Sequence, residues 1–402
     1  MKTCFDAVLG LAGVFCGAHG RYLMKACAGS IALVALLSAM AFTPVLARAD
    51  DVVVGVNWYG AKPNDLDPAT QEANLTAMEK AGIHVIRSGL DPDPNKVIEF
   101  LQRAKNHDIK IVWLMSLQYP KGVRASPPPS GWPWRNPGLS QADPNSFRDV
   151  FGPLFARLDT LGLTLAAFEL DNEINWIGNG DFPVPGKGRL LSLEDLSRGT
   201  EGQRIAQGFL QYLKVLATLK EMRDHLKFNQ HTPVISAGLA DSASAAQPFR
   251  IGGILVDSVD INTTLRFLRA NGLDRLVDGY SVHHYPTSIK AGTKEGADLR
   301  LSRMMQNVFA QCGSSTGGKP CWLTEWGFNI DGDACPVNES IRTALVREVR
   351  NDFGQLAQQG QLKGLLFFSW RDDTHAARED HSNVIRCGSL TESGRLAIAP
   401  LR

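Results

Sequence analysis

Short β-branched runs alternate along this chain with longer segments in which apolar residues recur at helical spacing, and this alternation restricts the fold more than any other feature. A helix between two strands places those strands parallel in one sheet, as in βα units. The candidate strands, in chain order, are residues 52–57, 84–88, 109–116, 165–172, 234–239, 279–284, 321–325 and 364–370. The segments with helical periodicity include residues 67–80, 95–106, 146–161, 201–225, 297–311 and 340–358.

Eight parallel strands with intervening helices predict an α/β fold of the (β/α)₈ (TIM) barrel type, for which about 350 residues is an ordinary size. No linker, charge block or low-complexity tract interrupts the chain after residue 50, so we expect a single domain over residues 50–402. An open doubly wound sheet is the alternative. It is disfavoured because the sequence GVNWYG at 55–60, after the first strand, lacks the glycine-rich phosphate-binding pattern.

The N-terminal residues 1–49 have the order of a secretory signal peptide. Lys25 precedes an apolar run at 31–42, and small residues flank the end of the segment at Ala47 and Ala49. The run is shorter than the roughly 20 residues that span a bilayer, so we expect cleavage after Ala49 and a secreted or periplasmic protein. Met24 is an alternative start, and an uncleaved N-terminal anchor is the alternative to cleavage.

Charge and cysteine content bear on partners and compartment. The formal net charge of +1 does not predict a nucleic-acid partner or, once the signal is removed, a membrane partner. The four cysteines after residue 49 are an even number in an exported chain, which favours two disulfides. Cys312 ends a helical segment and Cys321 opens the next strand, whereas Cys335 and Cys387 follow the last two strands. We therefore predict Cys312–Cys321 and Cys335–Cys387, one of three possible connectivities.

Four strand ends carry clusters of polar and aromatic residues: FELDNEINW (168–176), GYSVHHYP (279–286), WLTEWGFN (322–329) and LFFSWRDD (366–373). In a barrel the carboxyl ends of the strands form the active face. Glu173 and Glu325 end the fourth and seventh strands and are therefore expected to face each other across the mouth of the barrel. Two opposed carboxyl groups are typical of glycoside hydrolysis, in which one donates a proton while the other stays ionised.

These motifs, in this order, resemble clan A of the retaining glycoside hydrolases, most closely its families 5 and 39. In that clan an Asn-Glu pair closes strand four and a Glu closes strand seven, which matches Asn172-Glu173 and Glu325, the latter in a Thr-Glu-Trp-Gly setting. The resemblance implies that Glu173 is the acid/base and Glu325 the nucleophile. It departs from the clan after Glu173, where Ile174 stands in place of the usual Pro.

Further clan positions carry over one by one. The resemblance implies that Arg87 and Tyr285 hydrogen-bond the nucleophile and keep it ionised, that Asn172 holds the sugar 2-hydroxyl, and that Trp370 forms the floor of the subsite. The clan's His-x-Tyr motif on strand six resembles His283 and Tyr285, which share one face of the strand, so we expect both at the sugar site.

The local pattern raises two questions about side-chain direction. Glu169, Asp171 and Glu173 share a parity, so in an undistorted strand they point one way and Asn172 the other. For Asn172 and Glu173 both to reach the sugar, the strand must bulge or end there, and we predict that it does. A rival interpretation is that His283 and His284 bind a metal ion together. It is disfavoured because adjacent strand residues face opposite sides, so we expect His284 to be packed away from the site.

The sequence therefore predicts an exported, monomeric, retaining β-glycoside hydrolase that acts on a carbohydrate substrate without a cofactor or metal. A long stretch at 118–144, with Trp132 and Trp134, and an insertion at 177–200 fall on the active face and favour an open cleft and endo action. The alternatives are a non-catalytic carbohydrate-binding barrel, a transglycosylase that uses the same carboxylates, and a metal-dependent hydrolase on the same fold.

Overall fold

The computed structural model describes residues 52–59, 62–127, 135–286, 293–328, 339–370 and 383–401, all within the unit that spans residues 47–402. Eight of the strands form one parallel sheet in the order β10-β11-β12-β1-β2-β3-β4-β6. Their bounds are β1 Val53–Asn57, β2 Val85–Gly89, β3 Lys110–Met115, β4 Ala167–Leu170, β6 Val234–Ile235, β10 Tyr280–His284, β11 Cys321–Trp326 and β12 Leu362–Phe367.

The two edge strands of this sheet meet, which makes the sheet a barrel. Isolated bridges pair Ile235 with Gly279 and Leu239 with Val282, so the segment that follows β6 runs beside β10. Each predicted strand corresponds to one of the eight, and the predicted (β/α)₈ barrel is confirmed. The fifth candidate strand keeps the smallest fraction of its predicted length, because only Val234 and Ile235 of its six residues keep a regular ladder.

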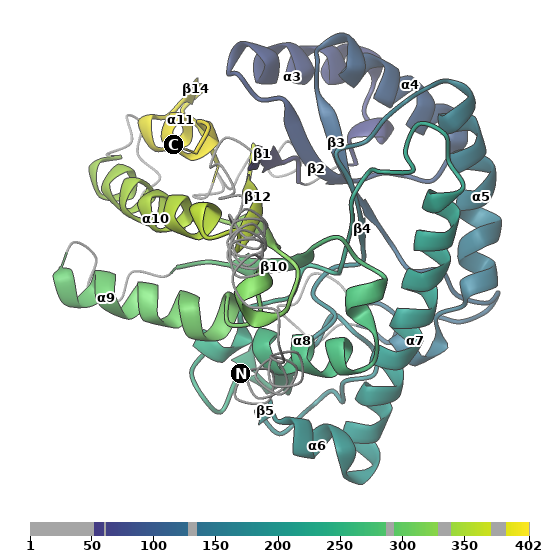
Figure 1. The fold of residues 1–402 in the computed structure, drawn as a ribbon, viewed down its shortest axis with the longest axis vertical. Helices are drawn as coiled ribbons and strands as arrows, with labels where there is room; N and C mark the ends of the chain where they lie inside the picture. Colours follow the sequence, from purple (N-terminus) through teal and green to yellow (C-terminus); the bar gives the residue numbers. More distant parts are fainter. Residues whose placement is uncertain are drawn as a thin grey trace, which may run out of the picture. The chain divides into compact units, whose positions relative to one another are not determined.

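Helices surround the strands on the outside (Figure 1). They are α3 Pro68–Lys80, α4 Pro94–Asn106, α5 Pro144–Thr160, α7 Gly199–Asp224, α8 Ile261–Ala270, α9 Lys294–Arg303, α10 Ser340–Gln358 and α11 Glu392–Ile398. Three of them begin with an aspartate followed by proline. The carboxylates of Asp67, Asp93 and Asp143 accept backbone N–H groups of the first turn, which satisfies donors that a helix leaves unpaired. The helical segments predicted from the sequence did not include α8.

Apolar side chains fill the barrel interior below the site. Val112, Ala167, Ile235, Trp322 and Leu366 come from five strands and form a separate buried cluster, as expected for inward-facing residues that pack in layers. The bulky indole of Trp322 requires glycine opposite it, because a Cβ at residue 364 would lie 2.2 Å from the ring. This packed plug leaves the carboxyl ends of the strands as the place where polar groups gather.

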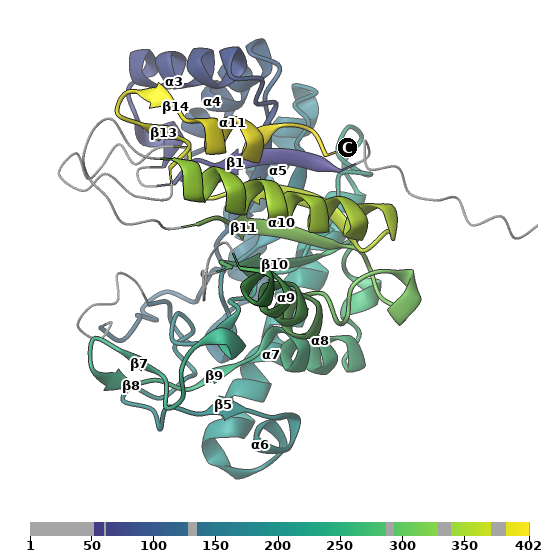
Figure 2. The same ribbon diagram turned by 90° about the vertical axis from the view of Figure 1, so that its left-hand side faces the viewer.

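The connections after the strands extend the active end of the barrel. The predicted insertion at 177–200 contains β5 Leu190–Leu191 and α6 Leu193–Ser197, and β5 pairs with β9 Ser258–Val259. Two small hairpins, β7 Arg250–Ile251 with β8 Ile254–Leu255 and β13 Ile385–Arg386 with β14 Ser389–Leu390, lie toward the same end of the barrel in Figure 2. Trp132 and Trp134 lie outside the described residues.

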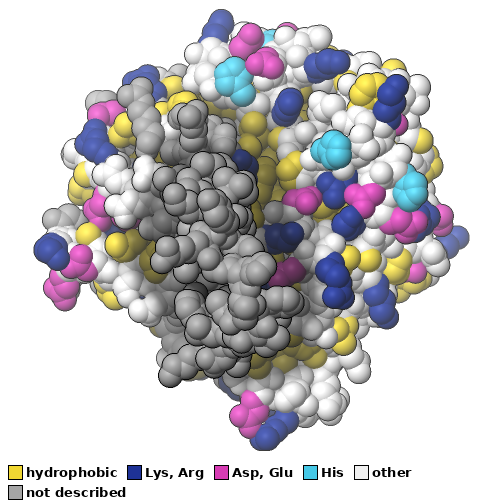
Figure 3. Space-filling view, viewed as in Figure 1, with side chains coloured by type: hydrophobic (Ala, Val, Ile, Leu, Met, Phe, Trp, Pro, Cys, Tyr) yellow, Lys and Arg dark blue, Asp and Glu magenta, His cyan; other side chains and the backbone are white. Residues whose placement is uncertain are grey.

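Two surface features bear on partners. On the face drawn in Figure 3, the described Lys and Arg side chains are interspersed with Asp and Glu. Within the described ranges, no helix has both the length and the apolar character needed to cross a membrane.

Candidate active site

The end of β4 carries the local backbone change that the sequence requires. The strand stops at Leu170, and the next odd-numbered residues, Asp171 and Glu173, have positive φ angles of 67° and 48°. Left-handed backbone is uncommon for residues other than glycine and changes the direction of the side chains around it. The backbone of this segment stays anchored, because the N–H of Glu173 donates to the carbonyl of Gly238. The prediction that the strand bulges or ends at Asn172 and Glu173 is confirmed, since the regular strand ends at Leu170.

Glu325, on β11, has a hydrogen-bond donor on each carboxylate oxygen. Nη1 of Arg87 donates to Oε1 at 2.7 Å, and the hydroxyl of Tyr285 donates to Oε2 at 2.6 Å. Burial would raise the pKa of Glu325, but attraction by His283 and Arg87 and the hydrogen bonds from Tyr285 and Arg87 outweigh it and lower the pKa. The site therefore keeps Glu325 ionised.

Tyr285 is suited to act as a donor only. Burial, followed by the nearby charge of Glu325, raises the pKa of Tyr285 well above its usual value. Its hydroxyl hydrogen is thus retained, and it points at the carboxylate it stabilises.

Arg87, in the middle of β2, links the site to the barrel interior. Its Nε and Nη2 donate to the two oxygens of Glu169 at 2.5 and 3.2 Å, while Nη2 also donates to Oδ1 of Asn172 at 2.7 Å. Nη1, besides Glu325, reaches Oδ1 of Asn57 at 2.9 Å. Burial would lower the pKa of Arg87, but the charges of Glu169 and Glu325 more than offset this and raise it. The guanidinium is therefore a permanent cation shared by two carboxylates.

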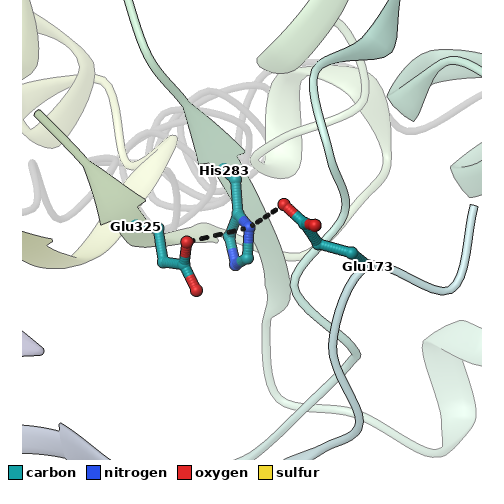
Figure 4. Close-up of side chains that lie close together, drawn as sticks. All are labelled: Glu173, His283 and Glu325. Carbon is teal, nitrogen blue, oxygen red and sulfur yellow. Dashed lines mark hydrogen bonds and ion pairs between the residues drawn. The ribbon is translucent and has the colours of Figure 1, made fainter. Parts of the chain in front are cut away.

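Figure 4 shows His283 between the two glutamates. Its Nδ1 lies 3.0 Å from Oε1 of Glu173 and 3.5 Å from Oε2 of Glu325. One ligand atom from each of the three groups lies within 4.8 Å of the others, so the two carboxylates approach one another closely. The indole N–H of Trp176 donates to the other oxygen of Glu173 at 3.0 Å, which leaves the Glu173 carboxyl held between a histidine and a tryptophan.

The neighbouring His284 faces elsewhere, as predicted. Its Nδ1 lies 3.1 Å from Oδ2 of Asp241, and both side chains are almost fully buried. The pair His283–His284 therefore does not point at a common centre.

A cavity of about 250 Å³ lies beside Glu325, on the side of β1 to β4. Amide, hydroxyl and charged groups share its wall with aromatic rings. Its lining residues are Asn57, Trp58, Tyr59, Arg87, Ser88, Gly89, Leu114, Ser116, Asn136, Asp171, Asn172 and Glu325.

The structure does not bring Trp370 to this cavity. The ring is only 2% exposed, and its N–H donates to Oδ1 of Asn74 on α3, so it packs between the barrel and that helix. The aromatic side chain of this segment that meets the site is Phe368, whose ring centroid lies 6.0 Å from that of Tyr285 and 5.0 Å from that of Tyr59. The sequence analysis therefore assigned the aromatic residue of the site to Trp370, two residues after Phe368.

The predicted Cys312–Cys321 disulfide is present and joins two fully buried cysteines across a sequence separation of 9 residues. It ties the chain before β11 to the first residue of that strand, at the opposite end from Glu325. Cys387 is also disulfide-bonded. Cys335 lies outside the described residues, so the second pairing stays a prediction.

Comparison with known proteins gives a match in fold but none in sequence. No family model matches the chain, and no curated protein sequence matches it. Among solved structures, an exo-β-1,4-mannosidase from an Opitutaceae bacterium, strain TAV5, superposes with a TM-score of 0.52 at 12% identity, covering 86% of this chain and 58% of that one. This chain thus spans little more than half the length of the mannosidase.

Two other similar structures match over nearly their whole length. A broad-specificity family 5 endoglucanase from Clostridium acetobutylicum has a TM-score of 0.50 at 13% identity, over 87% of this chain and 97% of that one. A family 5 xyloglucanase from Paenibacillus pabuli has a TM-score of 0.50 at 10% identity, over 87% and 98%. The chain has the fold of the clan A glycoside hydrolases. At these identities the likeness concerns the barrel, and the chemistry must be argued from the site.

On this barrel, the structure brings Arg87, Asn172, Glu173, His283, Tyr285 and Glu325 into one connected network. Sequence reasoning missed Asn57, whose side-chain N–H₂ donates to the carbonyls of Thr324, Leu366 and Phe367 while its oxygen accepts from Arg87. The sequence feature that could have identified Asn57 as a site residue is its position as the last residue of the first strand. The geometry therefore holds the carboxylate of Glu325 in its ionised form and places the carboxyl group of Glu173 close to it.

Proposed function

We propose that this protein is a retaining β-glycoside hydrolase in which Glu325 is the nucleophile and Glu173 the acid/base. The proposal rests on two observations. Arg87 and Tyr285 each donate a hydrogen bond to Glu325, and a carboxylate oxygen of Glu173 lies within 4.8 Å of one of Glu325. Retaining enzymes hold their carboxyl groups about 5–5.5 Å apart, whereas inverting enzymes need about 6.5–9.5 Å to admit a water molecule between them.

The two steps follow from the site. Glu173 donates its proton to the glycosidic oxygen as Oε of Glu325 forms a bond to the anomeric carbon, and the leaving group departs as an alcohol. Glu173, now a carboxylate, then takes a proton from water, whose oxygen bonds to the anomeric carbon as the bond to Glu325 breaks. His283 and Trp176 hold the Glu173 carboxyl near the leaving group in both steps.

The substrate class we propose is a β-linked oligo- or polysaccharide, cleaved internally outside the cytoplasm. The insertion that carries β5 and α6 and the β7–β8 hairpin extend the active end of the barrel, which supports contacts to more than one sugar unit of a chain. Capture of the glycosyl-enzyme by a sugar hydroxyl in place of water would make the same site a transglycosylase.

Variants of the two glutamates test this assignment. Glu325→Gln should lower kcat by about 10⁴-fold or more, because an amide does not form the intermediate. Glu173→Gln should slow cleavage strongly for substrates with a poor leaving group and much less for aryl glycosides, whose leaving groups need no proton. The exposed Glu221→Gln on α7 is the control and should match the wild type. A Glu325→Gln variant with near wild-type turnover would refute the mechanism.

Two alternatives have distinct outcomes in the same assay. Binding of oligosaccharide without any turnover would indicate a carbohydrate-binding barrel. The atoms of Glu173, His283 and Glu325 are also close enough to hold a metal ion, so loss of activity in a chelator would favour a metal-dependent hydrolase. We favour the glycosidase because both oxygens of Glu325 already accept hydrogen bonds from protein donors.

A further inference from the structure

Asp171 is a carboxylate in the wall of the cavity beside Glu325, and the mechanism above does not use it. The residue is 4% exposed and lines the cavity. Its Oδ1 accepts the backbone N–H of Asn172 at 2.8 Å. Its Oδ2 has no hydrogen-bond partner among the residues that the structure describes, and it is not sealed in the interior, so it opens to the cavity.

Burial of the Asp171 carboxyl group at this position destabilises the folded protein when no ligand is bound. Burial raises the pKa of Asp171 to about 7, with only the hydrogen bond from Asn172 opposing it. Arg87, the cation that lines the same cavity, is already shared by Glu169 and Glu325. The backbone at Asp171 is in addition left-handed. A buried carboxyl group without a full set of partners, on a strained backbone, is a feature that function more often explains than stability.

Other polar groups that line the cavity also lack side-chain hydrogen-bond partners among the described residues. The side-chain N–H₂ of Asn172, the hydroxyl of Ser116 and the side-chain amide of Asn136 all line the cavity, and none bonds to another side chain in the described ranges. Together with Asp171 they supply hydrogen-bond acceptors and donors to the cavity. At about 250 Å³ the cavity is below the roughly 300–1,000 Å³ typical of pockets for drug-sized ligands, which suits one sugar ring.

We propose that Asp171 determines specificity for the sugar ring held at Glu325: it binds a ring hydroxyl through Oδ2 and admits an uncharged ring while rejecting a uronic acid. The proposal rests on the glycosidase function proposed above. A hydroxyl donates a hydrogen bond to a carboxylate, so Asp171 gains the partner that the protein does not supply. A uronate would place a further negative charge beside the carboxyl group of Asp171 and the carboxylates of Glu169 and Glu325, which already share one guanidinium, and like charges repel.

The test compares wild type, Asp171→Ala and Asp171→Asn on the aryl β-glycoside that the wild type cleaves fastest and on the matching β-uronide. The measured quantities are kcat/KM for each substrate and their ratio. Asp149→Asn, which removes an exposed charge on α5 outside the cavity, is the control. Thermal unfolding confirms that each variant is folded. A merely structural role for Asp171 would change stability without changing the ratio of the two substrates.

Asp171→Ala should lower kcat/KM on the uncharged glycoside by about ten- to a hundred-fold, the value of a hydrogen bond to a charged group. Both variants should reduce the preference for the uncharged ring over the uronide by about tenfold or more. The proposal is overturned if both folded variants stay within about threefold of wild type and keep its preference, or if the wild type prefers the uronide. If the wild type cleaves neither these glycosides nor any β-linked polysaccharide, the glycosidase function itself fails.

Discussion

The hydroxyl of Tyr285 donates to Oε2 of Glu325 at 2.6 Å, and Nη1 of Arg87 occupies the other oxygen of the same carboxylate. This arrangement stabilises the charged form of Glu325 despite its burial. It also fixes the orientation of the carboxylate, because each oxygen has its own donor on a different strand or strand end. The consequences for activity and pH dependence can be measured directly.

Tyr285→Phe should move the acid limb of the pH profile of kcat/KM to higher pH. The lowered pKa of Glu325 depends in part on the hydrogen bond from Tyr285, so its loss makes the carboxylate easier to protonate. A hydrogen bond to a charged group contributes about 1.5–3 kcal/mol, which corresponds to roughly one to two pH units. The shift is read from initial rates between acidic and neutral pH.

Tyr280→Phe is the matched control, because Tyr280 begins β10, the strand that ends just before Tyr285, and donates to Asp274 at the far end of the barrel. Its acid limb should coincide with that of the wild type. An unchanged limb in Tyr285→Phe would show that Tyr285 does not hold Glu325 ionised.

Gly238→Ala should inactivate the protein by displacing His283. A Cβ at residue 238 would lie 2.1 Å from Nε2 of His283, a separation that forces the ring to move. Because Nδ1 of the same ring contacts Glu173, the proposed acid/base loses its alignment, and a displacement of about 1 Å can reduce the rate by about 10²-fold. Turnover of the variant on the best substrate measures the effect.

Gly152→Ala serves for comparison, since a Cβ there meets no atom within 4 Å and the residue lies inside α5. This substitution should leave activity unchanged and stabilise the helix by about 0.5–1 kcal/mol. If Gly238→Ala retained full activity, the tight approach to His283 would not matter for catalysis.

Asp171→Asn should stabilise the protein at alkaline pH. Burial raises the pKa of Asp171 from 3.8 to about 7, so between these values the folded state binds the proton more tightly than the unfolded state. The stability of the wild type therefore falls as pH rises through this window, and the variant avoids the loss. The gain should approach roughly 4 kcal/mol at most above pH 7 and vanish near pH 4.

Denaturant unfolding of Asp171→Asn and wild type at pH 4, 6 and 8 gives the three differences in free energy of unfolding. A variant that is less stable than wild type at pH 8 would contradict the buried, uncompensated carboxyl group described here.

Removing the Cys312–Cys321 disulfide should lower stability without affecting chemistry. A loop of 9 residues corresponds to about 2.5 kcal/mol in the chain-entropy account. The bond lies at the N-terminal end of β11, whereas Glu325 lies near its other end. Cys312→Ser with Cys321→Ser should thus unfold at lower denaturant but keep its kcat below the transition. A large loss of kcat in the folded variant would contradict this separation.

Much of the fold was predictable because strands and helices alternate with clear periodicity and aspartate-proline pairs mark several helix starts. The positions of Glu173 and Glu325 followed from strand order, because parallel strands bring their carboxyl ends together, whereas Arg87 and Tyr285 were identified by the resemblance to clan A. Trp370 was misplaced because the direction of a side chain after the end of a strand depends on the local backbone, which periodicity does not determine.

The environment of Asp171 could not be predicted for a related reason. Parity alone groups Asp171 with Glu169 and Glu173, yet the left-handed residues after Leu170 give the three carboxyls different surroundings. Glu169 is fully buried and bonded to Arg87, Ser281 and Thr324, while Asp171 opens to the cavity.

The anomeric configuration of the first product tests the central claim most directly. Proton NMR during cleavage of a β-glycoside distinguishes the two anomers before they equilibrate in water. The account predicts the β-anomer, formed by two displacements through a covalent bond to Glu325. Initial release of the α-anomer would mean a single displacement by water and would contradict Glu325 as a nucleophile placed this close to Glu173.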